Sequence, residues 1–352
     1  MAKLRFGICG LGCMGQSHFA RLRQHPRAEV VAICDADEAR RRGDWSGALG
    51  NIDLIKTGGG RVPLDGIHAY ATPAELIADR EVDVVLITLP TPQHAPVAVA
   101  ALSAGKHVLC EKPMAERAST CDRMIRAARS HERLLMVAQC IRFWPQYVKI
   151  KQMIDEGQIG AIRFVTLRRL ASPPTYSAGS WLLDGTQSGG AILDLHVHDV
   201  DFAQYLLGLP DTIHARGVRG LTGGIDHVVA TYGYADGRYA VIEGGWAFTA
   251  PWPFEMSITV HGERGTLEWS LSRGSAVSHY TGTEVRSIPC DGDALRSEQD
   301  YFIECLQAGR PVEQCTPVSS RMSVALAWLE RRAIETGRLV HVSKRWRERA
   351  NS

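Results

Sequence analysis

The sequence has little excess charge and no regular arrangement of cysteines. Its 352 residues carry 40 Lys and Arg against 38 Asp and Glu, which gives a formal net charge of +2. A chain this close to balance has no general attraction to nucleic acid or to an anionic membrane, so neither is expected as a partner. The nine cysteines contain no Cys-X-X-Cys pair. This absence argues against a disulfide or zinc framework and favours a reducing, cytoplasmic compartment.

A long apolar run is also missing. The start, MAKLRFGICG, has a short apolar stretch that meets a glycine-rich turn, where a secretory signal peptide needs a longer core and a cleavage site. No segment reaches transmembrane length. The hydrophobic fraction of 45% and the charged fraction of 22% are ordinary for a globular protein, and the length suits two domains.

The first third of the sequence alternates between apolar runs and helical patterns. Strands are expected at residues 4–9, 29–34, 82–88 and 107–110, and helices at 15–24, 36–42, 73–78 and 95–104. Such alternation is typical of parallel strands joined by right-handed crossovers, so we expect an α/β fold with a doubly wound, Rossmann-type sheet. The glycine-rich residues 43–66 have no clear period and are predicted to form a long loop or insertion.

Three glycines form a Gly-X-Gly-X-X-Gly motif, Gly10, Gly12 and Gly15, between the first strand and helix. The first permits a tight turn, the second removes a side chain that would block a pyrophosphate, and the third lets the helix pack on the strand. The helix N-terminus then offers N–H groups to the anion. Asp35 ends the next strand, where a carboxylate binds the adenosine ribose and repels a 2′-phosphate. NAD is therefore expected, while the arginines at 40–42 leave NADP open.

The second part of the chain is rich in consecutive strands. They are expected at residues 163–170, 212–220, 227–235, 239–248, 254–263 and 265–271, with helices at 191–207, 297–308 and 319–336. This pattern predicts an α+β domain on a mainly antiparallel, open-faced sheet. We expect a dinucleotide-binding domain over residues 1–138 and a substrate-binding and oligomerisation domain over 139–352, whose last helices could pack back on the first. An uncovered sheet face predicts a homo-dimer or homo-tetramer.

A second motif, AGKHVLCEKPMA, places Glu111, Lys112 and Pro113 just after a predicted strand. Ligands of open α/β folds bind at this edge of the sheet. An ammonium group in a partly dehydrated site can stabilise negative charge on a bound ligand. The alternative is a surface lysine fixed by its turn. The sequence permits a cis Lys112–Pro113 bond.

A third motif is SGGAILDLHVHDVDFAQYLLG, in which Asp194 and His198 are four residues apart on one predicted helix and so share a face. A carboxylate there orients the imidazole and supports its protonated form, as a general base near neutral pH requires. Asp201 shares the face and is interpreted as structural. His196 and His198 point about 200° apart on a helix, so no metal site is expected. His196 either contacts substrate or packs as a neutral core histidine.

With these motifs the chain resembles the Gfo/Idh/MocA oxidoreductases, the family of glucose-fructose oxidoreductase and inositol dehydrogenase. The resemblance rests on the order and spacing of the glycine motif followed by His18, ITLPTPQH, GKHVLCEKP and GGAILDLHVHDVD. It implies that Lys112 contacts the substrate hydroxyl and the nicotinamide ribose, and that His198 is the base with Asp194 as its partner. At His196 the chain departs from the family, where a small residue is common. The expected cofactor-binding residues are Gly10, Gly12, Met14, Gly15, Asp35, Pro90, Thr91, His94, Glu111 and Lys112.

The resemblance implies an NAD(P)-dependent dehydrogenase that oxidises a secondary alcohol of a sugar, inositol or related polyol. Two alternatives stay open. One is an enzyme that retains NAD and uses transient oxidation for epimerisation, elimination or glycoside cleavage. The other is a non-catalytic cofactor or metabolite sensor, which would not need Lys112, Asp194 and His198. Polyhydroxylated rings bind flat apolar faces beside hydrogen-bonding groups. The candidate pocket residues are Arg142, Tyr147, Trp181, Asp184 and His196.

Overall fold

A computed structural model describes residues 2–46, 60–343 and 346 of the chain. Two compact units make up the fold. The first lies within residues 1–139, 175–181 and 295–321, and the second within 140–174, 182–294 and 322–352. Each unit is built on one sheet. In the part of the chain that the structure describes, no helix is both long and apolar enough to cross a membrane.

The first unit contains a parallel six-stranded sheet with the strand order β3-β2-β1-β4-β5-β6. Its strands are β1 (Leu4–Cys9), β2 (Ala28–Cys34), β3 (His68–Tyr70), β4 (Val84–Ile87), β5 (His107–Glu111) and β6 (Leu135–Ala138). All four residues of β4 are buried, as expected of a strand covered on both faces. Because β1 pairs with both β2 and β4, the strand order reverses there. The predicted doubly wound, Rossmann-type sheet is confirmed.

Helices connect these strands. They are α1 (Cys13–Arg23), α2 (Glu38–Arg41), α3 (Pro73–Ala78), α4 (Thr91–Ser103) and α5 (Ala118–Ser130). Most of α10 (Ala294–Ala308), from a later part of the chain, also belongs to this unit but connects none of its strands. Helix α4 begins at Thr91, four residues before its predicted start. The proline in its first turn is tolerated there, because the backbone N–H groups of a first turn have no partner within the helix. The sequence patterns did not predict α5 or β6. Of the predicted loop at 43–66, residues 47–59 lie outside the described residues.

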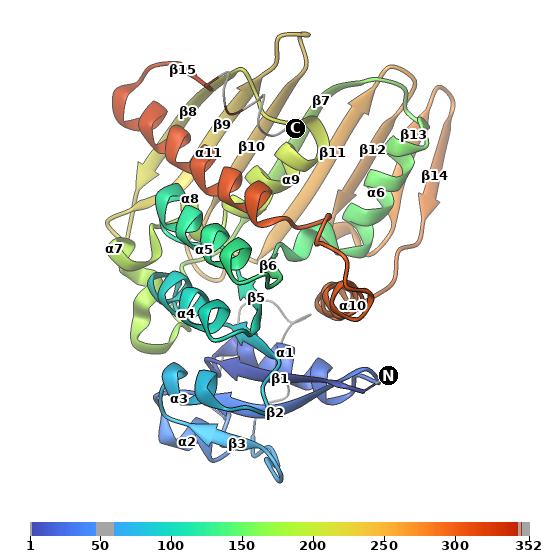
Figure 1. Ribbon diagram of the computed structural model, residues 1–352. Coiled ribbons are helices and arrows are strands. Elements are labelled where there is room, and N and C mark those ends of the chain that lie inside the picture. Colours follow the sequence, from blue (N-terminus) through green and yellow to red (C-terminus); the bar gives the residue numbers. More distant parts are fainter. Residues whose placement is uncertain (1, 47–59, 344–345, 347–352) are drawn as a thin grey trace. The chain divides into compact units, whose positions relative to one another are not determined.

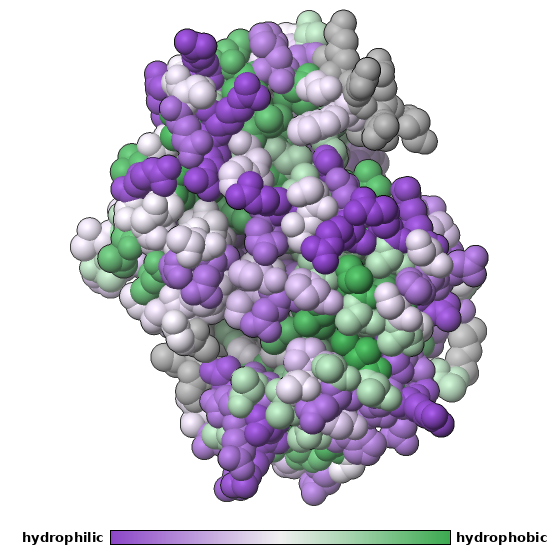
Figure 2. All heavy atoms as spheres, turned by 60° about the vertical axis from the view of Figure 1, so that its left-hand side comes forward, coloured by the Kyte–Doolittle hydropathy of each residue, from purple (hydrophilic) through white to green (hydrophobic). Residues whose placement is uncertain are grey.

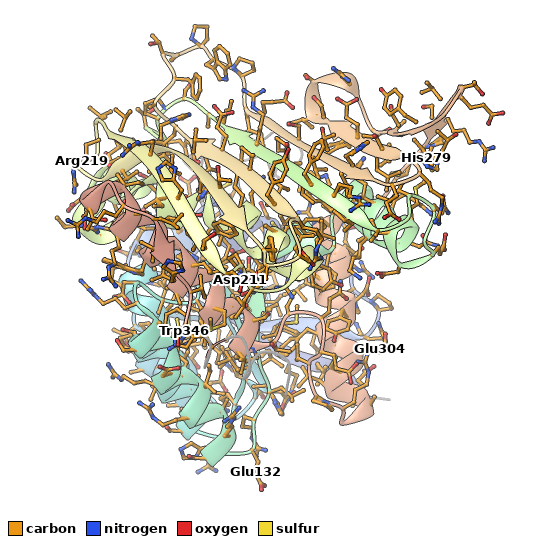
Figure 3. The ribbon with its side chains drawn as sticks, turned by 90° about the horizontal axis from the view of Figure 1, so that it is seen from above. Glu132, Asp211, Arg219, His279, Glu304 and Trp346 are labelled. Carbon is orange, nitrogen blue, oxygen red and sulfur yellow. The ribbon has the colours of Figure 1, made fainter. Side chains whose placement is uncertain are left out.

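The second unit contains a nine-stranded sheet with the order β14-β13-β12-β11-β7-β10-β9-β8-β15. Its strands are β7 (Ile162–Leu170), β8 (Thr212–Arg219), β9 (Ile225–Gly233), β10 (Tyr239–Gly245), β11 (Glu255–Gly262), β12 (Thr266–Ser270), β13 (Val277–Thr281), β14 (Glu284–Ile288) and β15 (Val340–His341). Figure 3 shows Arg219 of β8 and His279 of β13 near opposite edges of this sheet. The sheet is mainly antiparallel as predicted, but β7 and β10 pair in parallel.

Helices lie against one face of this sheet (Figure 1). The unit's helices are α6 (Pro145–Asp155), α7 (Gly185–Ser188), α8 (Ala191–Asp194), α9 (Val197–Leu207) and most of α11 (Pro317–Thr336). Along β11 every second residue is buried, so only one face of the sheet lines the core.

The other face of the nine-stranded sheet is partly exposed. There Phe164 of β7 stacks on Tyr239 of β10, with ring centroids 5.3 Å apart. On the other side of β7, the ring of His261 in β11 lies 5.0 Å from that of Phe164. In the space-filling view of Figure 2, hydrophobic and hydrophilic side chains are interspersed over the surface. That this face of the sheet packs on another subunit stays a prediction.

Candidate active site

The glycine motif forms a tight turn between β1 and α1. Gly10 has a φ of +96°, and a Cβ on it would lie 2.7 Å from the carbonyl oxygen of Thr88. A Cβ on Gly15 would clash with the carbonyl oxygen of Gly10. Around Gly12, in contrast, no heavy atom of another described part of the chain lies within 4 Å of the Cβ position. The turn is therefore packed on its inner side and open at Gly12, which fits the predicted approach of a pyrophosphate to the N-terminus of α1.

Asp35 is fixed at the end of β2 by two backbone donors. Its Oδ2 accepts a hydrogen bond of 2.7 Å from the Leu11 amide, and its Oδ1 accepts one of 2.9 Å from the Asp37 amide. The carboxylate thus ties the glycine turn to the end of the neighbouring strand. Nη1 of Arg40 lies 3.6 Å from Oδ2 of Asp35, and Nε of Arg40 lies 3.7 Å from the Asp37 carboxylate. Because carboxylates already surround Arg40, the geometry favours NAD over NADP.

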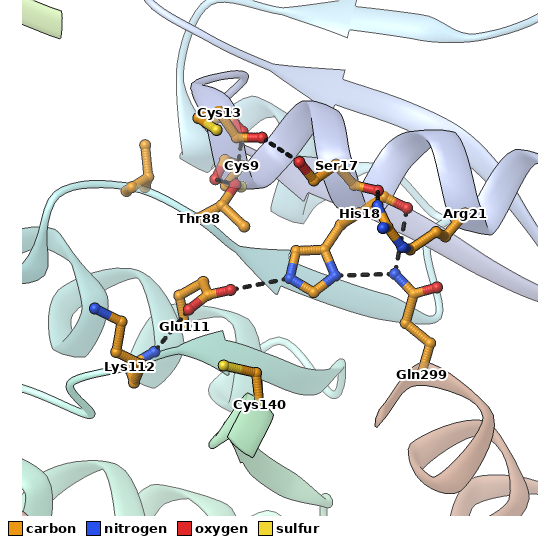
Figure 4. Close-up of polar contacts among 12 residues, drawn as sticks. Cys9, Cys13, Ser17, His18, Arg21, Thr88, Glu111, Lys112, Cys140 and Gln299 are labelled. Carbon is orange, nitrogen blue, oxygen red and sulfur yellow. Dashed lines mark hydrogen bonds and ion pairs between the residues drawn. The ribbon is translucent and has the colours of Figure 1, made fainter. Parts of the chain in front are cut away.

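The turn after β5 carries Lys112, which is half-buried and is followed by a cis peptide bond to Pro113. Glu111 points inward: its Oε1 lies 3.0 Å from Nε2 of His18, and its Oε2 accepts a hydrogen bond from the Lys112 amide (Figure 4). Burial would raise the pKa of Glu111, but the His18 hydrogen bond, the charge of Lys112 and the amide donor together lower it. Glu111 is therefore a carboxylate at neutral pH.

The loop after β4 leads directly into α4. Pro90 is the residue before the helix, and Thr91, its first residue, is buried. His94 is also buried, with Nδ1 2.9 Å from the carbonyl oxygen of Pro113 and Nε2 2.8 Å from that of Leu89. Burial lowers the pKa of His94, although both carbonyl acceptors partly offset the effect.

The predicted cofactor residues of the first unit gather at one sheet edge. Gly10, Asp35, Pro90 and Lys112 follow the carboxyl ends of β1, β2, β4 and β5, which are neighbours in the sheet. Dinucleotides bind at such an edge, where the strand order reverses. The direct contacts predicted for Met14 and Thr91 stay predictions. For His94 and Glu111 the buried partners favour support of the turns over contact with the cofactor.

The predicted single helix over residues 191–207 is wrong, because the chain forms two helices. Helix α8 ends at Asp194 and α9 begins at Val197. The break arises where the His196 amide donates to the carbonyl oxygen of Ala191, five residues back, which widens one turn. A spacing of four residues therefore no longer places Asp194 and His198 on one face, and their pairing stays a prediction. Sγ of Cys140 lies 4.0 Å from Nδ1 of His198.

Two buried ion pairs hold the start of α9. Nε of Arg169 donates to Oδ2 of Asp199 at 2.8 Å. Arg142 donates to both carboxylate oxygens of Asp201, at 2.6 and 2.8 Å. Both carboxylates follow His198 in the first turns of α9, so the helix that carries His198 is anchored just after this residue by charges that face the core. The interpretation of Asp201 as structural agrees with this geometry.

His196 is a core residue in this structure. It is fully buried, with Nε2 3.0 Å from Oε2 of Glu330, whose Oε1 accepts a hydrogen bond of 2.7 Å from the Tyr232 hydroxyl. A Cβ on Gly244 would lie 2.5 Å from the His196 ring, so the glycine makes room for the imidazole. Of the two interpretations left open for His196, the geometry favours packing. Among residues 2–46, 60–343 and 346, no cluster of His, Cys, Asp and Glu could hold a metal ion.

Two of the residues predicted for a substrate pocket have buried partners within the second unit. Arg142 is committed to Asp201, and its guanidinium lies 4.5 Å from the ring centroid of Tyr205. Tyr147 is fully buried and packs edge-to-face on Phe202 at 4.8 Å. Neither side chain is placed for contact with a soluble substrate. Trp181 is half-buried, and its role stays a prediction.

Sequence reasoning missed the partners that hold the two motifs in place. Gln299 of α10 contacts His18 across 281 residues of sequence, and Arg169 reaches Asp199 from β7. No local pattern marks such residues, because their importance comes from contacts between distant segments. His18 was visible only as the residue that follows the glycine motif.

Comparisons with known proteins agree with this geometry. The sequence model described as "Oxidoreductase family, NAD-binding Rossmann fold" matches residues 4–139, and the one described as "GFO/IDH/MocA C-terminal domain" matches residues 147–268. Together these matches cover most of the chain.

Named relatives match over nearly the full length. The chain is 27% identical to myo-inositol 2-dehydrogenase of Thermotoga maritima, covering 97% of this chain and 99% of the relative. It is 28% identical to inositol 2-dehydrogenase 2 of Saccharopolyspora erythraea, covering 95% and 94%. The crystal structure of a probable dehydrogenase from Thermotoga maritima matches with a TM-score of 0.78 at 25% identity, covering 96% of this chain and 98% of that one. The chain therefore belongs to the Gfo/Idh/MocA family of NAD-dependent oxidoreductases.

Proposed function

We propose that this protein is an NAD-dependent dehydrogenase that oxidises a secondary alcohol of inositol, a sugar or a related polyol. Relatives that match over the full chain are named inositol 2-dehydrogenases. The observation that carries the proposal is the position of Lys112 directly after β5, at the same sheet edge as the glycine turn and Asp35. A cationic group at that edge can act on an alcohol beside a bound nicotinamide.

The proposed chemistry divides between two side chains. The Lys112 ammonium polarises the substrate oxygen and stabilises the negative charge that develops on it. His198 takes the hydroxyl proton, because an imidazole titrates near neutral pH and can act as a general base. NAD, when bound, supplies the acceptor for the hydride. Arg169 and Arg142 hold Asp199 and Asp201, which follow His198 in α9, and this keeps the backbone of α9 fixed while His198 changes its charge.

Cofactor choice is assigned to Asp35. Both of its oxygens are oriented by backbone amides, so the carboxylate keeps its position without a ligand. A fixed carboxylate at this strand end accepts hydrogen bonds from ribose hydroxyls and repels a 2′-phosphate. The side chain therefore supports NAD in preference to NADP.

The test is NADH formation with a panel of inositols, aldoses and sugar acids. The purified chain is mixed with NAD or NADP and each substrate, and the reduced cofactor is followed by absorbance. We expect NADH to accumulate with at least one cyclic polyol or sugar. Lys112→Ala and His198→Ala should abolish turnover while NAD binding persists, whereas the control His214→Ala, on the exposed surface of β8, should leave turnover unchanged. Turnover that survives in both active-site variants would refute the assignment.

The same assay separates net oxidation from redox-neutral recycling. An enzyme that retains NAD consumes substrate without accumulating NADH, so substrate loss is measured in parallel by chromatography. Substrate loss without NADH would point to epimerisation, elimination or glycoside cleavage. Cofactor binding without any substrate loss over the whole panel would point to a sensor.

A further inference from the structure

The two residues on either side of Lys112 are each held by a buried histidine from a different helix. His18 of α1 contacts the Glu111 carboxylate at 3.0 Å, and His94 of α4 contacts the Pro113 carbonyl oxygen at 2.9 Å. His18 is fully buried and His94 is 1% exposed. Histidines are rarely this buried unless their nitrogens have partners. Here both partners belong to the neighbours of one lysine.

The neighbours of His18 determine which of its nitrogens carries the proton. The side-chain nitrogen of Gln299 lies 3.2 Å from the His18 carbonyl oxygen and 2.9 Å from Nδ1 of the His18 ring (Figure 4). A carbonyl oxygen only accepts, so the amide must present its NH₂ group there, and that group also donates to Nδ1. Nε2 is then the protonated nitrogen and donates to Glu111. Since Glu111 also accepts from the Lys112 amide, α10, α1 and the Lys112 backbone form one chain of hydrogen bonds.

His94 joins two loops. Its ring lies between the carbonyl oxygens of Pro113, in the turn after β5, and Leu89, in the loop after β4. A neutral imidazole has one N–H and donates to one of these at a time, and a protonated ring donates to both. The charged groups that act on this ring are Glu111 and Lys112. The ring therefore sets the spacing between the two loops on this part of the sheet edge.

We propose that His18 and His94 are positioning residues that hold the Glu111–Pro113 backbone so that the Lys112 ammonium is presented at a fixed point. Neither imidazole touches substrate in this account, and both act through the backbone that carries the lysine. The inference rests on the proposed function, because it gives Lys112 its role. Misplacement of a catalytic group by about 1 Å can lower a rate about a hundredfold, so such support has a measurable effect.

The matched test uses asparagine and glutamine at both histidines. A glutamine amide reaches about as far as Nε2 of histidine, and an asparagine amide about as far as Nδ1. His18→Gln keeps a donor to Glu111, whereas His18→Asn loses it. At position 94 the order is reversed: His94→Asn keeps a donor to Pro113, whereas His94→Gln keeps only the contact to Leu89. Every variant retains one polar contact and none adds a charge.

We expect a reciprocal pattern in kcat. His18→Asn and His94→Gln should lower kcat for NAD reduction about tenfold or more, while His18→Gln and His94→Asn should stay within about threefold of the wild type. NAD affinity, measured by fluorescence titration, should change little in all four, because the glycine turn and Asp35 are untouched. The control is His25, another buried histidine of the same unit, which contacts Asp300 and the Arg27 amide. Asparagine and glutamine at His25 should leave kcat unchanged.

A second readout does not depend on the substrate. Labelling with acetic anhydride, followed by peptide mass analysis, compares the reactivity of Lys112 with that of Lys106, whose ammonium donates to the carbonyl oxygens of Asp79 and Val82. The ratio should change in His18→Asn and His94→Gln and not in the other variants. If the wild type oxidised no polyol while the labelling ratio followed this pattern, the proposed function would fail and the positioning role would stand. The positioning role would be overturned if asparagine and glutamine had equal effects on kcat and on the labelling ratio at each site, or if the order of the effects were reversed.

Discussion

Arg142 and Asp201 form a buried two-point ion pair, with Nε and Nη2 of the guanidinium 2.6 and 2.8 Å from the two carboxylate oxygens. Ser323 donates a further hydrogen bond of 2.7 Å to the same carboxylate. From the sequence, Arg142 was predicted to line a substrate pocket and Asp201 to have a structural role. Its geometry instead joins the segment before α6 to the helix that carries His198.

Removal of one partner from this pair should destabilise the protein strongly. Arg142→Met leaves the Asp201 carboxylate buried without its counter-charge, so the free energy of unfolding should fall by about 3–5 kcal/mol. The control is Arg168→Met, which removes an exposed pair with Glu243 and should cost about 0–1 kcal/mol. Urea unfolding followed by circular dichroism measures both. Similar costs for the two variants would contradict the account.

The fold was largely predictable where local patterns decide it. The strand, glycine turn and helix at the start of the chain follow one another as local pattern predicts, and β11 of the second unit shows period-2 burial. The break between α8 and α9 was not predictable, because residues 191–207 keep a helical pattern throughout. It depends on one widened turn at His196, whose ring is placed by Gly244 and Glu330 from distant segments.

The candidate site was predictable in its motifs and not in its supports. Gly10, Asp35 and Lys112 were placed correctly at strand ends, because the carboxyl ends of parallel strands meet at one edge. Gln299 could not be found, since only the fold brings α10 to His18. For the same reason His94 was interpreted as a cofactor contact, although its ring nitrogens face two backbone carbonyls.

Glu298 is a buried acid without a hydrogen-bond partner for either oxygen among the described residues. Burial, together with the nearby Glu111 charge, raises its pKa well above the usual value of 4.5. In the unfolded chain the same group ionises at about its normal pKa, so the folded state loses stability as the pH rises from about 4.5 toward the raised folded pKa.

Glu298→Gln removes this cost, because glutamine does not ionise and has nearly the same shape. We expect the variant to unfold at a higher temperature than the wild type at neutral pH, and the difference to shrink as the pH falls toward about 4.5. Calorimetry over that range measures it. Gln299→Glu, which places an extra acid beside His18, is the opposite change and should lower the melting temperature. A variant Glu298→Gln that melted below the wild type at neutral pH would contradict the prediction.

Three histidines of the first unit should make it sensitive to mild acid. Burial lowers the pKa values of His94, His107 and His25 in the folded state. As the pH falls below about 6.5, the unfolded chain binds protons that the folded unit resists, so stability falls with pH over that window. Because Glu298 has the opposite pH dependence, the test uses the Glu298→Gln variant, whose melting temperature should drop between about pH 7.5 and about pH 5.5. His94→Asn in this background should reduce the slope, and a melting temperature of Glu298→Gln that stayed constant would be inconsistent with neutral buried imidazoles.

Asp35 should control the choice between NAD and NADP. Asp35→Ser removes the carboxylate from the end of β2, so NADH affinity should fall about tenfold or more and NADPH affinity should rise as Arg40 loses its counter-charge. Fluorescence titration with each reduced cofactor measures this without any substrate. Asp37→Ser is the control, because Asp37 also lies beside Arg40 but is half-exposed and does not contact Leu11. Equal changes in both variants would count against a specific role for Asp35.

The most direct test follows the hydride itself. Inositols and sugars deuterated at their ring carbons are incubated with the protein and NAD, and the nicotinamide is analysed by mass spectrometry. This readout detects oxidation whether or not NADH accumulates. The account predicts deuterium on the nicotinamide with the wild type, and none with Lys112→Ala or His198→Ala at saturating NAD. Two results would contradict the central claim. One is deuterium transfer that continues in both variants, and the other is a wild type that transfers deuterium from none of the polyols tested.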